Sequence, residues 1–188
     1  MNQLPMLYPK NYLARRVFAF PGSAFRIEVD GQLRFYVRQK PFKLKEEITV
    51  FADEACTTPA LGIQARSVLD FGATYDITDK LTGENLGAGR RQGLKSLFQD
   101  AWDILGPSGE VIGSMKEDRM LFAILRRFFS NLIPQQFVLR IGDRQVGTFR
   151  QRFNPFRLSY DVEMGEGLDP RVGVAMMVLV LAIEGRQN

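Results

Sequence analysis

The residues whose types and spacing suggest a chemical role are arginines in the last third of the chain. Between residues 119 and 157 there are eight arginines and one acid, Asp143, a local net charge of +7, whereas the whole chain carries +4. The planar guanidinium fork binds two phosphate or carboxylate oxygens at once. A basic segment on an otherwise near-neutral chain therefore predicts one surface that faces an anion, with a solvated charged face as the alternative.

Strand alternation selects four of these arginines. In VGTFRQRF, alternation places Thr148 and two arginines on one face, with Phe149 and Phe153 on the other. The runs FVLRI and FRLSYDV place one arginine each on the outward face, and if the three strands are neighbours the arginines form one patch. The candidates for binding an anionic lipid headgroup or a phosphate are Arg140, Arg150, Arg152 and Arg157.

A predicted helix between Asp118 and Pro134 adds two further candidates, Arg126 and Arg127. Its apolar residues recur at helical spacing, which favours packing of one stripe on the rest of the protein. The alternative is a peripheral helix that lies on lipid, with Phe122 and Phe129 beside these two arginines.

The sequence lacks the residues that most catalytic mechanisms require. There is no histidine and one cysteine, Cys56, which excludes Ser-His-Asp and Cys-His catalysis, histidine-ligated metals, a multi-cysteine zinc site and an intrachain disulfide. There is also no G-x-S-x-G, Walker A or G-x-G-x-x-G motif. We therefore expect a non-enzymatic protein without a cofactor.

The acids of YDVEMGEGLD, with Asp161 and Glu163 foremost and Glu166 and Asp169 beside them, could gather oxygens around a hard cation, but their spacing matches no calcium loop.

The apolar stretch Val172–Ile183 must be surrounded by protein. Its twelve residues would span about 18 Å as a helix, whereas a bilayer core is about 30 Å thick, so no transmembrane span is expected. Asp169 suits the N-cap, Pro170 the first helical position, and Gly185 the end. A helix of residues 170–184 that is apolar on every side predicts a central, buried element.

Short strands with regular turns make up most of the remaining chain. FRIEVDGQLRFYVRQ alternates around Asp30-Gly31, as a hairpin does. Tyr75–Arg91 and Trp102–Asp118 repeat one pattern, an aromatic-Asp-Ile strand, a turn before Gly-Glu, and a glycine early in the return strand; Val138–Gln151 is a looser third copy. The turn glycines permit a tight turn, and the later glycines indicate a bulge or close packing against the helix. The sequence thus predicts a mainly β fold, a barrel wrapped around the C-terminal helix.

The ordered set FKLKEEITVFAD, LDFGATYDITDKLTGENLGAGRR and GLKSLFQDAWDILGPSGEVIGSMKED, with the final apolar helix, resembles the tubby-like superfamily. More narrowly it resembles the LURP-one-related and phospholipid scramblase branch, from about Leu33 to Ile183. The resemblance implies a barrel of about twelve strands threaded by the hydrophobic helix. We expect one such domain over residues 1–188, with residues 1–14 irregular and one additional peripheral helix.

The resemblance also implies a function. Tubby proteins bind phosphoinositides through basic barrel residues, which favours binding of anionic phospholipid through the arginine patch. Scramblase-like lipid transfer is the alternative, although the chain lacks the proline-rich extension, the cysteine cluster and the calcium-loop motif of scramblases. A protein-interaction or nucleic-acid-binding module could use the same face. However, the aromatic residues of these strands point inward, which leaves few rings on which bases could stack. One cysteine and no apolar secretion signal favour a cytoplasmic protein, peripheral at the inner face of the membrane.

Overall fold

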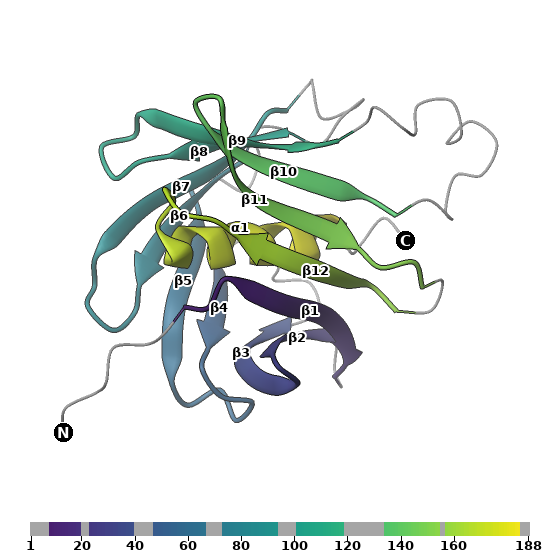
Figure 1. Ribbon diagram of the computed structural model, residues 1–188. Helices are drawn as coiled ribbons and strands as arrows, with labels where there is room; N and C mark the ends of the chain where they lie inside the picture. The colour runs from purple at the N-terminus through teal and green to yellow at the C-terminus, as the bar shows by residue number, and fades with distance from the viewer. Residues whose placement is uncertain are drawn as a thin grey trace.

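A closed antiparallel barrel of twelve strands forms the described part of this computed structural model, which covers residues 8–19, 23–39, 47–66, 73–93, 101–118, 134–154 and 157–184. Each strand pairs with its neighbours in the chain, and β1 closes the barrel against β12 (Figure 1). The strands are β1 (Asn11–Phe18), β2 (Ser23–Val29), β3 (Gln32–Gln39), β4 (Glu47–Phe51), β5 (Pro59–Ala65), β6 (Thr74–Asp79), β7 (Asn85–Arg91), β8 (Ala101–Leu105), β9 (Val111–Glu117), β10 (Gln136–Ile141), β11 (Arg144–Gln151) and β12 (Ser159–Met164). The predicted mainly β barrel is confirmed.

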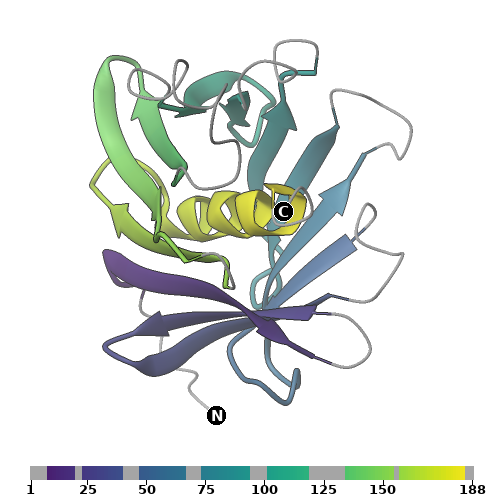
Figure 2. The same ribbon diagram turned by 90° about the vertical axis from the view of Figure 1, so that its right-hand side faces the viewer.

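The helix α1 (Pro170–Glu184) lies inside the barrel, and Figure 2 shows strands on every side of it. Its residues from Val172 to Ala182 are buried. The apolar stretch is therefore core, and no helix in the described residues has the length and hydropathy to cross a bilayer. Asp169 is the N-cap, as predicted, because its Oδ1 accepts a 2.8 Å hydrogen bond from the Arg171 backbone N–H.

The repeated hairpins have the predicted glycine geometry. A glycine with positive φ turns each of them, Gly83, Gly109 and Gly142. The second glycine of each repeat lies at a β-bulge, as the shifts of register in the three hairpins show. At Gly87, φ is +113° and an added Cβ would lie 2.1 Å from the Leu105 carbonyl oxygen. The close approach at this glycine is therefore to the next strand.

Two further expectations concern the N-terminal residues and the peripheral helix. Residues 11–14 were expected to be irregular, but β1 begins at Asn11. The physical reason is barrel closure: Tyr12 and Ala14 are buried inside the wall, and β1 pairs with β2 on one side and β12 on the other. The predicted peripheral helix falls almost entirely on residues 119–133, which lie outside the described residues.

The barrel has two distinct ends. At the entry end, where α1 begins, lie the turns that join β2 to β3, β4 to β5, β6 to β7, β8 to β9 and β10 to β11. At the far end, α1 finishes, β1 and β11 finish, and β12 begins. The entry end is on the left of Figure 1 and the far end on the right. This division decides which surface side chains can act together.

Candidate functional site

Arg150 occupies the middle of the predicted arginine patch. β10, β11 and β12 are consecutive neighbours in the barrel, the arrangement on which the patch depended. Arg150 on β11 lies opposite Gln136 of β10 and Asp161 of β12. Its side chain is exposed, whereas the neighbouring Phe149 is only 1% exposed and faces the core. Strand alternation therefore directs the arginine outward.

Arg152 forms a two-pronged ion pair with Asp161. Its Nε and Nη2 donate to the two carboxylate oxygens at 2.8 and 2.7 Å. The hydrogen bonds from Arg152 and the nearby charge of Arg150 lower the pKa of Asp161 despite its partial burial. The pair neutralises one arginine of the patch, and about half of each side chain remains exposed. Such an exposed pair can exchange partners at little cost.

The positive charges of Arg150 and Arg157 are not compensated by a direct ion pair with any described residue. The Arg150 Nε donates to Gln136 Oε1 at 3.2 Å, and the backbone N–H of Arg157 donates to Asn154 Oδ1 at 3.0 Å. No carboxylate in the described residues lies within ion-pair distance of either guanidinium. Both guanidinium groups are therefore available to an external anion.

Arg140 lies apart from the other candidates. It pairs in register with Gln145, close to the turn at the entry end, and its Nη1 donates to the Asp143 carbonyl oxygen at 3.5 Å. Gln136, opposite Arg150, is four residues earlier on the same strand, which corresponds to about 13 Å along β10. The structure thus does not bring Arg140 together with the candidates near the far end. Arg126 and Arg127 lie outside the described residues.

Barrel closure adds two arginines that the sequence reading missed. Arg15 on β1 lies opposite Ser159 of β12 and Arg26 of β2, and the Arg152 N–H donates to the same Ser159. Arg152, Arg15 and Arg26 therefore lie in one row across four strands. We define the arginine face as this row together with the two unpaired arginines on either side of it. Its members are Arg15, Arg26, Arg150, Arg152 and Arg157.

A buried carboxylate fixes the β1–β2 part of the arginine face. Glu28 is 4% exposed and accepts from Arg15 Nη2 at 2.6 Å and from Arg26 Nε at 3.2 Å. Burial alone would raise the pKa of Glu28, but the hydrogen bonds from the two arginines outweigh it and the pKa is lowered. Arg26 also pairs with Glu54. The guanidinium groups of Arg15 and Arg26 are consequently held in place by these carboxylates. Strand alternation in β1 and β2 is the sequence signal that could have identified both arginines as outward-facing.

The candidate cation ligands do not converge in the structure. Asp161 binds Arg152, Glu166 binds Lys10 at 3.2 Å, and Asp169 binds Arg171. Glu163 is exposed on β12, opposite Asn11 and Thr148. Within the described ranges, no three acids or cysteines lie close enough to hold a metal ion.

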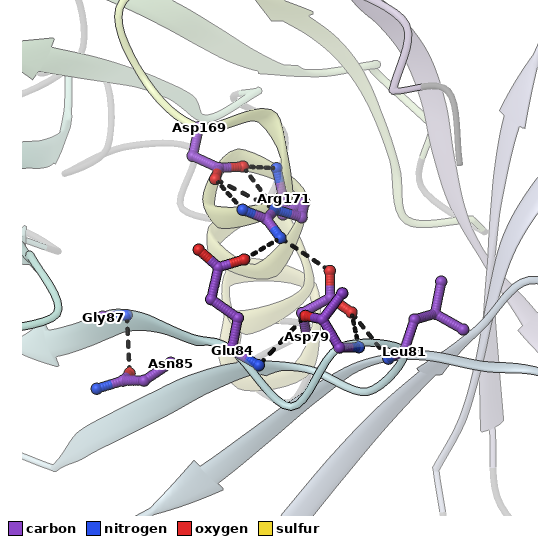
Figure 3. A network of polar contacts seen from close by, with 8 residues as sticks. Asp79, Leu81, Glu84, Asn85, Gly87, Asp169 and Arg171 are labelled. Atoms are coloured by element: carbon purple, nitrogen blue, oxygen red, sulfur yellow. Dashed lines mark hydrogen bonds and ion pairs between the residues drawn. The ribbon is translucent and has the colours of Figure 1, made fainter. Parts of the chain in front are cut away.

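A second polar site lies at the entry end, where Arg171 joins the helix to the β6–β7 hairpin (Figure 3). Its Nη1 donates to Asp79 Oδ2 at 2.9 Å and to Glu84 Oε2 at 2.7 Å, and its Nη2 to Asp169 Oδ2 at 2.7 Å. Asp79 also accepts from the backbone N–H groups of Leu81 and Thr82. One guanidinium thus ties together the N-cap and a hairpin 92 residues earlier in the chain.

The electrostatics of this network support a structural role. Burial would raise the pKa of Asp79, but the hydrogen bonds from Arg171 and the two turn N–H groups outweigh it and lower the pKa. Burial and the charge of Asp79 raise the pKa of Tyr8 to about 12. Because all three carboxylates share the Arg171 guanidinium, the network fixes the helix at the entry end.

Comparison with known proteins identifies the family. No curated protein matches the chain, and no solved structure matches it either. The family model for LURP-one-related proteins matches residues 33–181, from β3 to the last turns of the central helix. With this match over most of the chain and a closed barrel around a hydrophobic helix, the chain belongs to the LURP-one-related family, within the tubby-like superfamily.

Proposed function

We propose that this protein is a non-enzymatic module that binds the anionic headgroups of phospholipids at a membrane surface through the arginine face. The observation that carries the proposal is the pair of exposed arginines, Arg150 and Arg157, on either side of the Arg152–Asp161 pair near the far end. Each guanidinium can take two oxygens of one phosphate. Membership in the tubby-like superfamily supports the same function.

The expected affinity follows from the charges. The five arginines of the arginine face meet three carboxylates, Glu28, Glu54 and Asp161, so the face keeps a net charge of +2. An arginine near an anionic membrane contributes about 1 kcal/mol. Two uncompensated arginines therefore contribute roughly 2 kcal/mol, about a thirtyfold enrichment at the surface. Binding of this kind is weak and decreases as salt screens the charges.

Co-sedimentation with vesicles tests the proposal. Vesicles of phosphatidylcholine alone are compared with vesicles that also contain phosphatidylglycerol or phosphoinositide, at low and at physiological salt. We expect binding to the anionic vesicles only, and its loss in the double variant Arg150→Glu/Arg157→Glu. Arg140→Glu/Arg144→Glu makes the same charge change near the entry end and serves as the matched control. Equal loss in both variants, or no binding of the unsubstituted protein, would refute the proposal.

The same vesicles separate binding from other uses of the arginine face. Lipid labelled in one leaflet reports transfer, and we expect no transfer above background because α1 is enclosed by strands. A single-stranded oligonucleotide added as a competitor reports nucleic-acid binding. Displacement from the vesicles at a low oligonucleotide concentration would contradict lipid as the ligand of this face.

A further inference from the structure

Two phenylalanine rings lie in solvent at the far end of the barrel. Phe18 is 87% exposed and Phe153 is 63% exposed. The other large hydrophobic residues that are exposed in the described part of the chain, Leu81 and Val111, lie at the turns of the entry end. Clustered apolar exposure of this kind, beside charged residues, is typical of an interaction surface.

The two rings lie on either side of one strand. Phe18 is the last residue of β1, and Phe153 follows the end of β11 by two residues. β12 runs between β1 and β11, and its Ser159 is opposite Arg15 and bonded to the Arg152 N–H. Two strand spacings separate the rings sideways by about 10 Å. They are therefore close enough to contact one partner together.

Strand alternation shows why these rings are exposed. Tyr12 and Ala14 on β1, and Phe149 on β11, face the core and are buried. Phe18 and Phe153 have the same parity as these residues, but they lie where the strands end and the barrel wall stops. Alternation alone would bury both rings, and only their position at the rim leaves them in water.

The arginine face beside the two rings favours a membrane over other partners. Arg152 directly precedes Phe153, and Arg157 lies on the segment that leads into β12, between the two rings. Apolar side chains that enter the boundary between headgroups and acyl chains, together with cations at the headgroups, are the combination that binds peripheral proteins to anionic lipid. Arg150 and Arg157, the two arginines of the face without a direct ion pair in the described residues, can each bind two oxygens of a lipid phosphate.

We propose that Phe18 and Phe153 insert into an anionic bilayer when the arginine face binds its headgroups, so that the far end of the barrel points towards the membrane. This inference rests on the proposed lipid binding and adds the depth and the orientation of the bound protein. The arginines supply attraction that depends on salt, and the rings supply a part that does not.

Tryptophan substitution tests the insertion directly. The chain has one tryptophan, Trp102, which is fully buried, so its emission serves as a constant background. Phe18→Trp and Phe153→Trp are compared with Val111→Trp, which places the same probe at the entry end. With phosphatidylglycerol vesicles that carry brominated acyl chains, we expect the first two to shift to the blue and to be quenched, and the third to remain unchanged.

Serine substitution tests the energetic part. Phe18→Ser/Phe153→Ser keeps every charge, and we expect at least tenfold weaker vesicle binding and loss of the residual binding at physiological salt. If the unsubstituted protein binds and the arginine variant does not, while the tryptophan probes are unquenched and the serine variant binds normally, the insertion is refuted and lipid binding stands. If the rings instead bury against a second copy, sedimentation velocity shows a dimer that the serine variant dissolves, which also overturns the insertion.

Discussion

Replacing Arg171 with methionine tests whether the polar network at the entry end stabilises the barrel. Methionine keeps an unbranched, largely aliphatic side chain but removes the guanidinium hydrogen bonds to Asp79, Glu84 and Asp169. The Asp79 side chain is 8% exposed, so its carboxylate would remain charged in a nearly dry site with two backbone donors. We expect the free energy of unfolding to fall.

The size of the loss follows from the exposure of each partner. Removal of one member of a buried ion pair costs about 3–5 kcal/mol. The two remaining hydrogen bonds to Asp79, from Leu81 and Thr82, reduce this cost, and the pair with Glu84, which is 54% exposed, contributes little because water screens it. The expected net loss is about 2–4 kcal/mol.

Urea unfolding followed by the fluorescence of Trp102 measures this loss, because the ring is buried in the barrel and the chain has no other tryptophan. Asp79→Asn and the double variant with Arg171→Met complete a mutant cycle. We expect the double variant to lose less stability than the two single variants together, since removal of both charges leaves no buried ion. Equal or greater stability of Arg171→Met would refute a stabilising network.

The pH dependence gives an independent check with a definite sign. In the native protein the pKa of Asp79 is lowered, so the stabilisation from its charge is present above the unfolded value and is lost as pH falls through the lower folded value. That window lies below about pH 4. Without Arg171, burial dominates and should raise this pKa, so protonation relieves the penalty. We therefore expect the difference between the two proteins to be largest near pH 7 and to shrink as pH falls from the raised pKa of the variant towards the lowered pKa of the native protein.

Three further substitutions use the same unfolding assay. Gly87→Ala should cost about 2 kcal/mol or more, because φ is +113° and the new Cβ would meet the Leu105 carbonyl oxygen; an unchanged midpoint would contradict the bulge geometry. Leu179→Ala, fully buried on α1, should cost about 2–5 kcal/mol by leaving a cavity in the core. Arg152→Ala should cost no more than about 1 kcal/mol, since its pair with Asp161 is half exposed; a larger loss would mean that the pair is structural.

Local patterns in the sequence were enough to predict the barrel and its helix. The run from Val172 is too short to cross a bilayer and too apolar to lie on a surface, and Asp169 and Pro170 fix where the helix begins. The glycines of the repeated hairpins marked turns and bulges, because both depend on backbone geometry within a few residues. These predictions are confirmed.

The composition of the arginine face could not be predicted in this way. Alternation identified the outward arginines of β11, but Arg15 joins them only because β1 closes the barrel against β12, more than 130 residues later in the chain. The same alternation grouped Arg140 with Arg150, although position along the strand separates them. Periodicity determines which face a side chain occupies and does not determine its level on the barrel.

By itself the sequence determined the kind of fold, because helix caps, turns and apolar periodicity act between residues that are near one another in the chain. The tertiary structure decided which distant groups meet. It paired Arg171 with Asp79, 92 residues away, gathered the arginine face across four strands, and left Phe18 and Phe153 exposed at the rim. Those contacts depend on how the strands register as the barrel closes, and closure is a property of the whole chain.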